Sequence, residues 1–115
     1  MKTIAIDFDG VIHKYSKGYS DGSLYDTPVE GAFDAIKKLM NWGFAVYILS
    51  TRKPENVQNW FAEQKLGIPT QIIKEEVFWE IPNVLGLSNR KIPAIAYIDD
   101  RGLRFTNWKD ILNYF

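Results

Sequence analysis

The sequence contains no cysteine and only one histidine. A chain without cysteine forms no disulfide and offers no thiolate to a metal or a substrate, and one histidine excludes a zinc site built from several histidines of one chain. No apolar run approaches the roughly 20 residues of a membrane-spanning helix, and no charged-then-apolar leader precedes the first strand pattern. We therefore expect a soluble, cytoplasmic protein without a membrane partner.

The sequence also lacks an excess of charge, since 14 basic residues balance 14 acidic ones. A neutral total gives no support for nucleic acid as a partner, although a local basic patch remains compatible with it. In contrast, 46% of the residues are hydrophobic and 15% are aromatic, which is enough for a buried core. The length of 115 residues predicts one domain spanning residues 1–115.

Short apolar runs alternate with helical patterns along the chain. Strands are predicted at residues 3–8, 44–49, 68–73 and 94–98, with a short edge strand at 103–106. Helices are predicted to begin at Thr27–Pro28, Pro54 and Asn107, the first two ending at Gly43 and Gly67, and residues 75–88 are predicted to form short helical pieces. This alternation predicts a three-layer, Rossmann-like α/β fold, with a central parallel sheet and helices on both faces.

Three predicted strands end in polar side chains. These are Asp7 and Asp9, then Ser50 and Thr51, then Asp99 and Asp100. In a parallel sheet the carboxyl ends of the strands lie at one edge, where ligands bind. Four carboxylates at one edge repel one another unless a cation lies between them, and Mg²⁺ prefers such oxygen ligands. The sequence therefore predicts a magnesium site at this edge.

Two further segments offer contacts to an anion. The hydroxyl of Ser50 and the backbone N–H groups of Thr51 and Arg52 follow a strand, where they can hold phosphate oxygens; the alternative is that they cap the next helix. Lys91, just before the strand at 94–98, can offset the charge of a phosphorylated aspartate; the alternative is an ordinary surface lysine.

The order of these motifs resembles the haloacid dehalogenase superfamily. Its four motifs correspond here to Asp7-Phe8-Asp9-Gly10-Val11, Ser50, Lys91 and Asp99-Asp100, and they span nearly the whole chain. The segments DFDGVIHKY and KIPAIAYIDDRGLRF resemble small bacterial and phage members that carry no cap domain. The resemblance implies a Mg²⁺-dependent phosphomonoester phosphatase that acts through an aspartyl-phosphate.

The resemblance also implies a role for each motif residue. Asp7 is the nucleophile, Asp9 is the general acid and base, Ser50 and Thr51 hold the phosphate, Gly10 turns the backbone beside it, and Lys91 neutralises charge. Asp7, the backbone carbonyl of Asp9, and Asp99 or Asp100 hold the metal, with Asp100 favoured as the direct ligand. Arg52 flanks the site and is a candidate for a second anionic group of the substrate.

The segment 11–26 is too short for a cap domain, so the resemblance implies an open site. An open site is typical of a large substrate, of closure by a partner, or of modest selectivity. His13, Tyr15, Tyr19 and Tyr25 lie in this segment, and we interpret them as aromatic residues of a surface loop rather than as substrate contacts.

Other functions remain open at this stage. A receiver domain has similar length and residue types, but it carries its acidic pair early and its acceptor aspartate after the third strand, the reverse of the order here. A catalytically idle binding or regulatory domain with the same fold is the alternative to an enzyme. A nucleotide or polynucleotide 3′-phosphatase is the alternative substrate class. The sequence defines neither the physiological substrate nor the oligomeric state.

Overall fold

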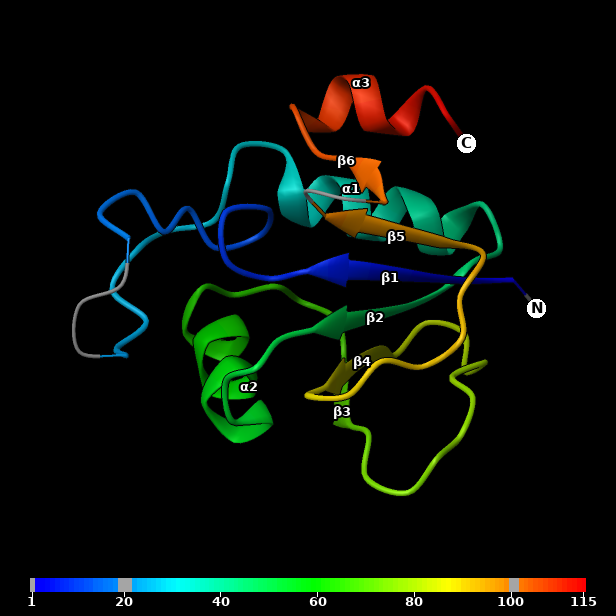
Figure 1. Cartoon of the computed structure of the whole chain (residues 1–115), viewed down its shortest axis with the longest axis horizontal. Helices are drawn as coiled ribbons and strands as arrows, with labels where there is room; N and C mark the ends of the chain where they lie inside the picture. The colour runs from blue at the N-terminus through cyan, green and yellow to red at the C-terminus, as the bar shows by residue number, and fades with distance from the viewer. Residues whose placement is uncertain (1, 19–21, 100–101) are drawn as a thin grey trace.

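A computed structural model describes residues 2–18, 22–99 and 102–115, which form an α/β unit around one parallel sheet. The six strands are β1 (Thr3–Asp7), β2 (Ala45–Leu49), β3 (Thr70–Ile72), β4 (Leu85–Ser88), β5 (Ala96–Asp99) and β6 (Leu103–Arg104). Their order is β3-β4-β2-β1-β5-β6, and every pair is parallel. In Figure 1 the arrows of β1, β2 and β5 point the same way, toward the loop that leads from β1 to α1.

The described residues contain three α-helices, α1 (Ala32–Asn41), α2 (Pro54–Glu63) and α3 (Trp108–Leu112). Pro54 occupies the first turn of α2, and the side chain of Asn107 accepts a hydrogen bond from the Asp110 N–H to cap α3, both as predicted. None of these helices is long and apolar enough to cross a membrane.

The buried residues of all three helices pack against one face of the sheet. They form a single core with alternate residues of the central strands, such as Ile4 and Ile6 of β1 and Val46 and Ile48 of β2. The opposite face is covered by the connections 73–84 and 89–95, which contain no helix. The sheet is therefore parallel and flanked by helices as predicted, but the expected helices on both faces are not found in the described part of the chain.

Backbone-to-tyrosine hydrogen bonds close this second face. The buried hydroxyl of Tyr47 donates to the Ile92 carbonyl at 2.6 Å and accepts from the Ile92 N–H at 2.8 Å, and Tyr97 donates to the same carbonyl. We call Tyr47, Ile92 and Tyr97 the Ile92 cluster. Burial raises the pKa of Tyr47 to about 12, since the low-dielectric surroundings disfavour its ionised form.

The first helix begins later than predicted. The prediction placed its start at Thr27–Pro28, but α1 begins at Ala32, after Gly31. The backbone of residues 27–29 pairs instead with the loop after β1, because Lys14 N–H donates to the Thr27 carbonyl and Val29 N–H donates to the Ile12 carbonyl. Tertiary pairing has outweighed the local capping signal.

Two further predictions need correction. Residues 75–88 contain no helical piece; they form an irregular segment followed by β4, where Gly86 lies against the buried ring of Trp79 so closely that a Cβ would be 2.7 Å from it. α2 ends at Glu63, before the predicted Gly67. Lys65 takes the left-handed conformation (φ 59°) that usually follows the end of a helix, and its N–H donates to the Ala62 carbonyl. The α1 end follows the prediction, with Gly43 at φ 97°.

Candidate functional site at the carboxyl edge of the sheet

Strand order brings the polar strand tips together. β1 lies between β2 and β5, so its carboxyl end adjoins theirs. The registers pair Asp7 with Leu49 and Ile6 with Ile98, which places Ser50 and Asp99 one residue beyond these pairs. Segments that are more than 40 residues apart in the sequence thus meet at one edge of the sheet.

Asp9 is held from two sides. Its Oδ1 accepts a hydrogen bond from His13 Nδ1 at 2.9 Å, and Arg52 Nε lies 2.9 Å from Oδ2 and 3.2 Å from Oδ1. The Asp9 side chain is 28% exposed and the Arg52 side chain 13% exposed, so this ion pair is partly shielded from water. The Asp9 carboxyl group therefore lies between two hydrogen-bond donors, one from the loop after β1 and one from the turn after β2.

His13 is fully buried, which corrects its interpretation as a surface-loop residue. Its ring stacks on Phe8 with a centroid distance of 5.4 Å and meets the edge of Trp60 at 5.5 Å. Its Nε2 accepts a hydrogen bond from the backbone N–H of Asp26 at 3.1 Å. Both ring nitrogens are therefore bonded, one toward Asp9 and one toward Asp26. We call Asp9, His13, Asp26 and Arg52 the Asp9 cluster.

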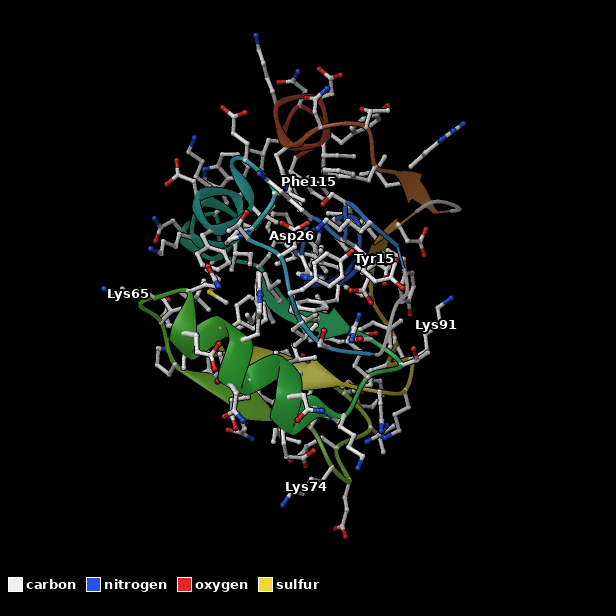
Figure 2. The ribbon with its side chains drawn as sticks, turned by 90° about the vertical axis from the view of Figure 1, so that its left-hand side faces the viewer. Tyr15, Asp26, Lys65, Lys74, Lys91 and Phe115 are labelled. Atoms are coloured by element: carbon white, nitrogen blue, oxygen red, sulfur yellow. The ribbon has the colours of Figure 1, made fainter. Side chains whose placement is uncertain are left out.

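Asp26 joins the loop after β1 to helix α2. Its carboxylate accepts from the N–H and the hydroxyl of Ser16 and from the Thr27 N–H, and its carbonyl accepts from Trp60 Nε1 at 2.9 Å. The Ser16 hydroxyl contributes most to holding the pKa of this carboxyl far below its usual value. Figure 2, which faces the carboxyl edge, shows Asp26 and Tyr15 near the centre of the view.

The predicted phosphate-binding segment follows β2 directly. Ser50 is buried, and its Oγ accepts from the Arg52 N–H at 3.1 Å. The alternative that Ser50 or Thr51 caps α2 is not observed, because the N-cap residue is Lys53. Thr51 is exposed. The Ser50 hydroxyl therefore holds the turn after β2 in place through the Arg52 N–H.

Arg52 makes contacts that sequence reasoning did not anticipate. Besides its bonds to Asp9, its Nη1 donates to the Gly22 carbonyl at 2.6 Å, and its guanidinium lies 5.6 Å from the centre of the Tyr15 ring. The sequence made Arg52 a candidate contact for a second anionic group of the substrate. Among the described residues, its contacts tie the loop after β1 to the tip of β2.

Lys91 lies against an aromatic ring. Its ammonium is 4.3 Å from the centre of the Tyr97 ring, an arrangement typical of a cation–π contact. Tyr97 precedes Asp99 by two residues on β5, so the two side chains share a face of the sheet. In Figure 2, Lys91 lies to the right, apart from Tyr15 and Asp26.

The remaining predicted residues divide between described and undescribed parts of the chain. Gly10 has φ 83°, a conformation that favours glycine, and its N–H donates to the His13 carbonyl. Asp7 Oδ1 accepts from the Phe8 N–H at 2.9 Å, and Asp99 Oδ1 accepts from the Gly102 N–H. The predictions for Asp100 and Tyr19 lie outside the described residues.

The oxygen ligands at this edge fit a hard cation only in part. Across residues 2–18, 22–99 and 102–115, no three acidic, histidine or cysteine side chains form a group that holds a metal. Asp7 and Asp99 end neighbouring strands and offer carboxylate oxygens, which suit Mg²⁺. The Asp9 carboxylate is bonded to Arg52 and His13, so Asp9 is better placed to contribute its backbone carbonyl than its side chain.

Comparisons of the chain with protein-family models, with curated proteins and with solved structures gave no match. The geometry of the site is therefore the basis of the functional argument.

The sequence reasoning missed the roles of His13 and Asp26 in this site. The one available signal was spacing, because a histidine four residues after Asp9 is close enough along the chain to reach it through a tight turn. The residues between them form such a turn, in which the Phe8 carbonyl accepts from the N–H groups of Val11, Ile12 and His13. Asp26 is 13 residues from His13, and only the fold brings them together.

Proposed function

We propose that this protein is a Mg²⁺-dependent phosphomonoester phosphatase in which Asp7 forms an aspartyl-phosphate. The observation that supports this most is the convergence of three strand tips at one edge, which brings Asp7 and Asp9, Ser50, and Asp99 together. Ligands of parallel α/β sheets bind at this edge. The resemblance of the four motifs to the haloacid dehalogenase superfamily supports the same assignment.

In the proposed reaction Asp7 attacks the phosphorus of a phosphate monoester. An Asp7 oxygen bonds to phosphorus while the bond to the ester oxygen breaks, and Asp9 supplies the proton that the leaving oxygen takes up. Water then attacks the phosphorus of the aspartyl-phosphate and gives a proton to Asp9. The bond to Asp7 breaks, inorganic phosphate leaves, and both aspartates return to their starting state.

Neighbouring groups support the phosphate in this proposal. Asp7, the Asp9 carbonyl and an acidic residue at the end of β5, Asp99 or Asp100, would hold Mg²⁺. When bound, the ion screens the repulsion between the Asp7 carboxylate and the anionic substrate. The Arg52 N–H is bonded to Ser50 Oγ, so the Ser50 hydroxyl and the Thr51 N–H of the turn after β2 would contact the phosphate oxygens. Lys91 would reach the site by leaving the Tyr97 ring.

The test is hydrolysis of an aryl phosphate with and without Mg²⁺ by the wild-type protein, Asp7→Asn and Asp34→Asn. Asp7→Asn keeps the shape of the side chain but removes the ionised nucleophile, so kcat should fall by several orders of magnitude. Asp34 is exposed on α1, and the same chemical change there serves as the matched control with unchanged kcat.

The outcomes separate the candidate functions. Turnover that needs Mg²⁺ and disappears in Asp7→Asn supports the proposal. Turnover that survives Asp7→Asn would contradict the nucleophile. A folded protein that binds Mg²⁺ but hydrolyses none of a panel of aryl, sugar, nucleotide and polynucleotide phosphates would favour an idle binding domain. Within an active panel, the preferred ester distinguishes small metabolites from nucleotide or polynucleotide ends.

A further inference from the structure

His13 is the only histidine of the chain, and its ring is completely buried beside the proposed acid and base. It lies between Phe8, Tyr15, Tyr25 and Trp60, with ring centroids 5.4–5.8 Å away. Both ring nitrogens of a buried histidine need hydrogen-bond partners, and here one of the two partners is the Asp9 carboxyl group.

The partners of the two nitrogens determine the tautomer. The Asp26 group facing Nε2 is a backbone N–H, which can only donate, so Nε2 must accept and carries no proton. In a neutral ring the proton is then on Nδ1, which donates to Asp9 Oδ1 at 2.9 Å. The backbone of Asp26 thus directs the single N–H donor of His13 toward the Asp9 carboxyl group.

Asp26 can perform this role because its own position is fixed from three directions. Ser16 and Thr27 donate to its carboxylate, and Trp60 of α2 donates to its carbonyl. Its N–H remains for His13. A continuous hydrogen-bonded path therefore runs from helix α2 through Asp26 and His13 to Asp9.

We infer that His13 is a positioning residue, which holds the Asp9 carboxyl group in its working orientation while Asp26 holds His13 in the Nδ1–H tautomer. This inference rests on the proposed function, because it assumes that Asp9 exchanges protons with the leaving group and with water. Arg52 Nε lies within hydrogen-bond distance of both Asp9 oxygens, whereas His13 bonds to Oδ1 alone and gives that oxygen a second donor. A misplacement of about 1 Å at such a group can cost about 100-fold in rate.

The tautomer can be measured without any substrate. The single histidine makes its ring nitrogen signals unambiguous in a ¹⁵N NMR spectrum of the wild-type protein. We expect Nδ1 at the shift of a protonated nitrogen and Nε2 at the shift of an unprotonated, hydrogen-bonded one. The opposite assignment, with the proton on Nε2, would overturn the inference whether or not the protein is a phosphatase.

Two isosteric variants separate the two bonds of His13. The amide nitrogen of His13→Asn occupies approximately the position of Nδ1 and can still donate to Asp9. The amide oxygen of His13→Gln occupies approximately the position of Nε2 and can still accept from Asp26, but no donor then faces Asp9. His13→Phe keeps the stacking on Phe8 and removes both bonds.

We expect kcat for the aryl phosphate to fall about 100-fold in His13→Gln and His13→Phe with KM nearly unchanged, and to recover largely in His13→Asn. The stability of the three variants is measured alongside by denaturant unfolding. A kcat that follows stability, or that is equal in the Asn and Gln variants, would overturn the positioning role. If the wild-type protein shows no turnover, the proposed function fails, and the NMR result then decides only whether Asp26 sets the tautomer.

Discussion

The Asp9 cluster and the Ile92 cluster are two hydrogen-bonded networks on the same sheet, but they are built from different groups. The Ile92 cluster uses two tyrosine hydroxyls and one peptide unit, all neutral. The Asp9 cluster contains two carboxyl groups, a guanidinium and an imidazole, and the Asp9 side chain is 28% exposed. The Ile92 cluster lies on the face of the sheet that the connections 73–84 and 89–95 cover, and the Asp9 cluster lies at the carboxyl edge.

This difference indicates different purposes. Neutral hydroxyls can bond to buried backbone groups without the desolvation cost of an ion. Such bonds suit the connection 89–95, which packs permanently against one face of the sheet. Charged groups at an edge cost more to bury, and such groups are concentrated where protons or anions are exchanged. We therefore expect substitutions in the Asp9 cluster to change activity more than stability, and substitutions in the Ile92 cluster to do the reverse.

The largest expected effect is that of Asp9→Asn on turnover. The variant cannot donate or accept the proton of the proposed reaction, so kcat for an aryl phosphate should fall about 10²–10⁴-fold. The amide oxygen can still accept from His13, but the amide NH2 then faces the Arg52 Nε donor, so the free energy of unfolding should fall by about 1–2 kcal/mol. Steady-state kinetics and urea unfolding measure the two quantities. If the free energy of unfolding falls by as much as the activation free energy rises, Asp9 acts mainly on stability and the comparison fails.

Next in size is the effect of Tyr47→Phe on stability. Removing the hydroxyl leaves the buried Ile92 N–H without a partner, which should cost about 1–3 kcal/mol in the free energy of unfolding. The kcat of the folded variant should equal that of the wild type, because Tyr47 lies outside the proposed site. Tyr114→Phe removes a hydroxyl from a ring that is 71% exposed and is the matched control. Equal stability of the two variants would contradict the role given to Tyr47.

The smallest expected effect is a change in the alkaline pH dependence of stability. The folded-state pKa of Tyr47 is about 12 and its ordinary value is 10.0, so the unfolded chain loses this proton first. The contribution of the neutral hydroxyl is therefore complete below pH 10 and declines as pH rises toward 12. Tyr47→Phe should show a flatter decline over this interval in urea unfolding series. An identical slope in both proteins would mean that Tyr47 ionises as easily when folded as when unfolded.

Much of the sheet could be predicted from the sequence because buried parallel strands have a distinctive composition. β1, β2 and β5 are short apolar runs followed by polar residues, and that combination predicted both the strands and the edge at which the candidate site residues lie. β4 was missed because Gly86 interrupts its apolar pattern, and the reason for that glycine, the nearby Trp79 ring, is a long-range contact. The start of α1 was misplaced for a similar reason, since its capping signal lies in a segment paired with the loop after β1.

The site shows the same division between local and long-range information. Asp7, Asp9, Ser50 and Asp99 were predicted as strand-tip residues because each directly follows or ends a recognisable strand. The contacts of Arg52 with Gly22 and of His13 with Asp26 depend on how the loop after β1 folds back, which local patterns do not encode. Motif position thus predicted the polar side chains at the edge, whereas their hydrogen-bond partners required the three-dimensional structure.

The central claim is that Asp7 becomes phosphorylated during turnover. The most direct measurement is an acid quench of the protein with Mg²⁺ and an aryl phosphate, followed by borohydride reduction, which converts an aspartyl-phosphate to homoserine, and peptide mass spectrometry. We predict homoserine at position 7 in the wild-type protein and in Asp34→Asn. Asp7→Asn should give none. Steady hydrolysis by a wild-type protein whose residue 7 stays unmodified, or homoserine at another aspartate, would contradict the account.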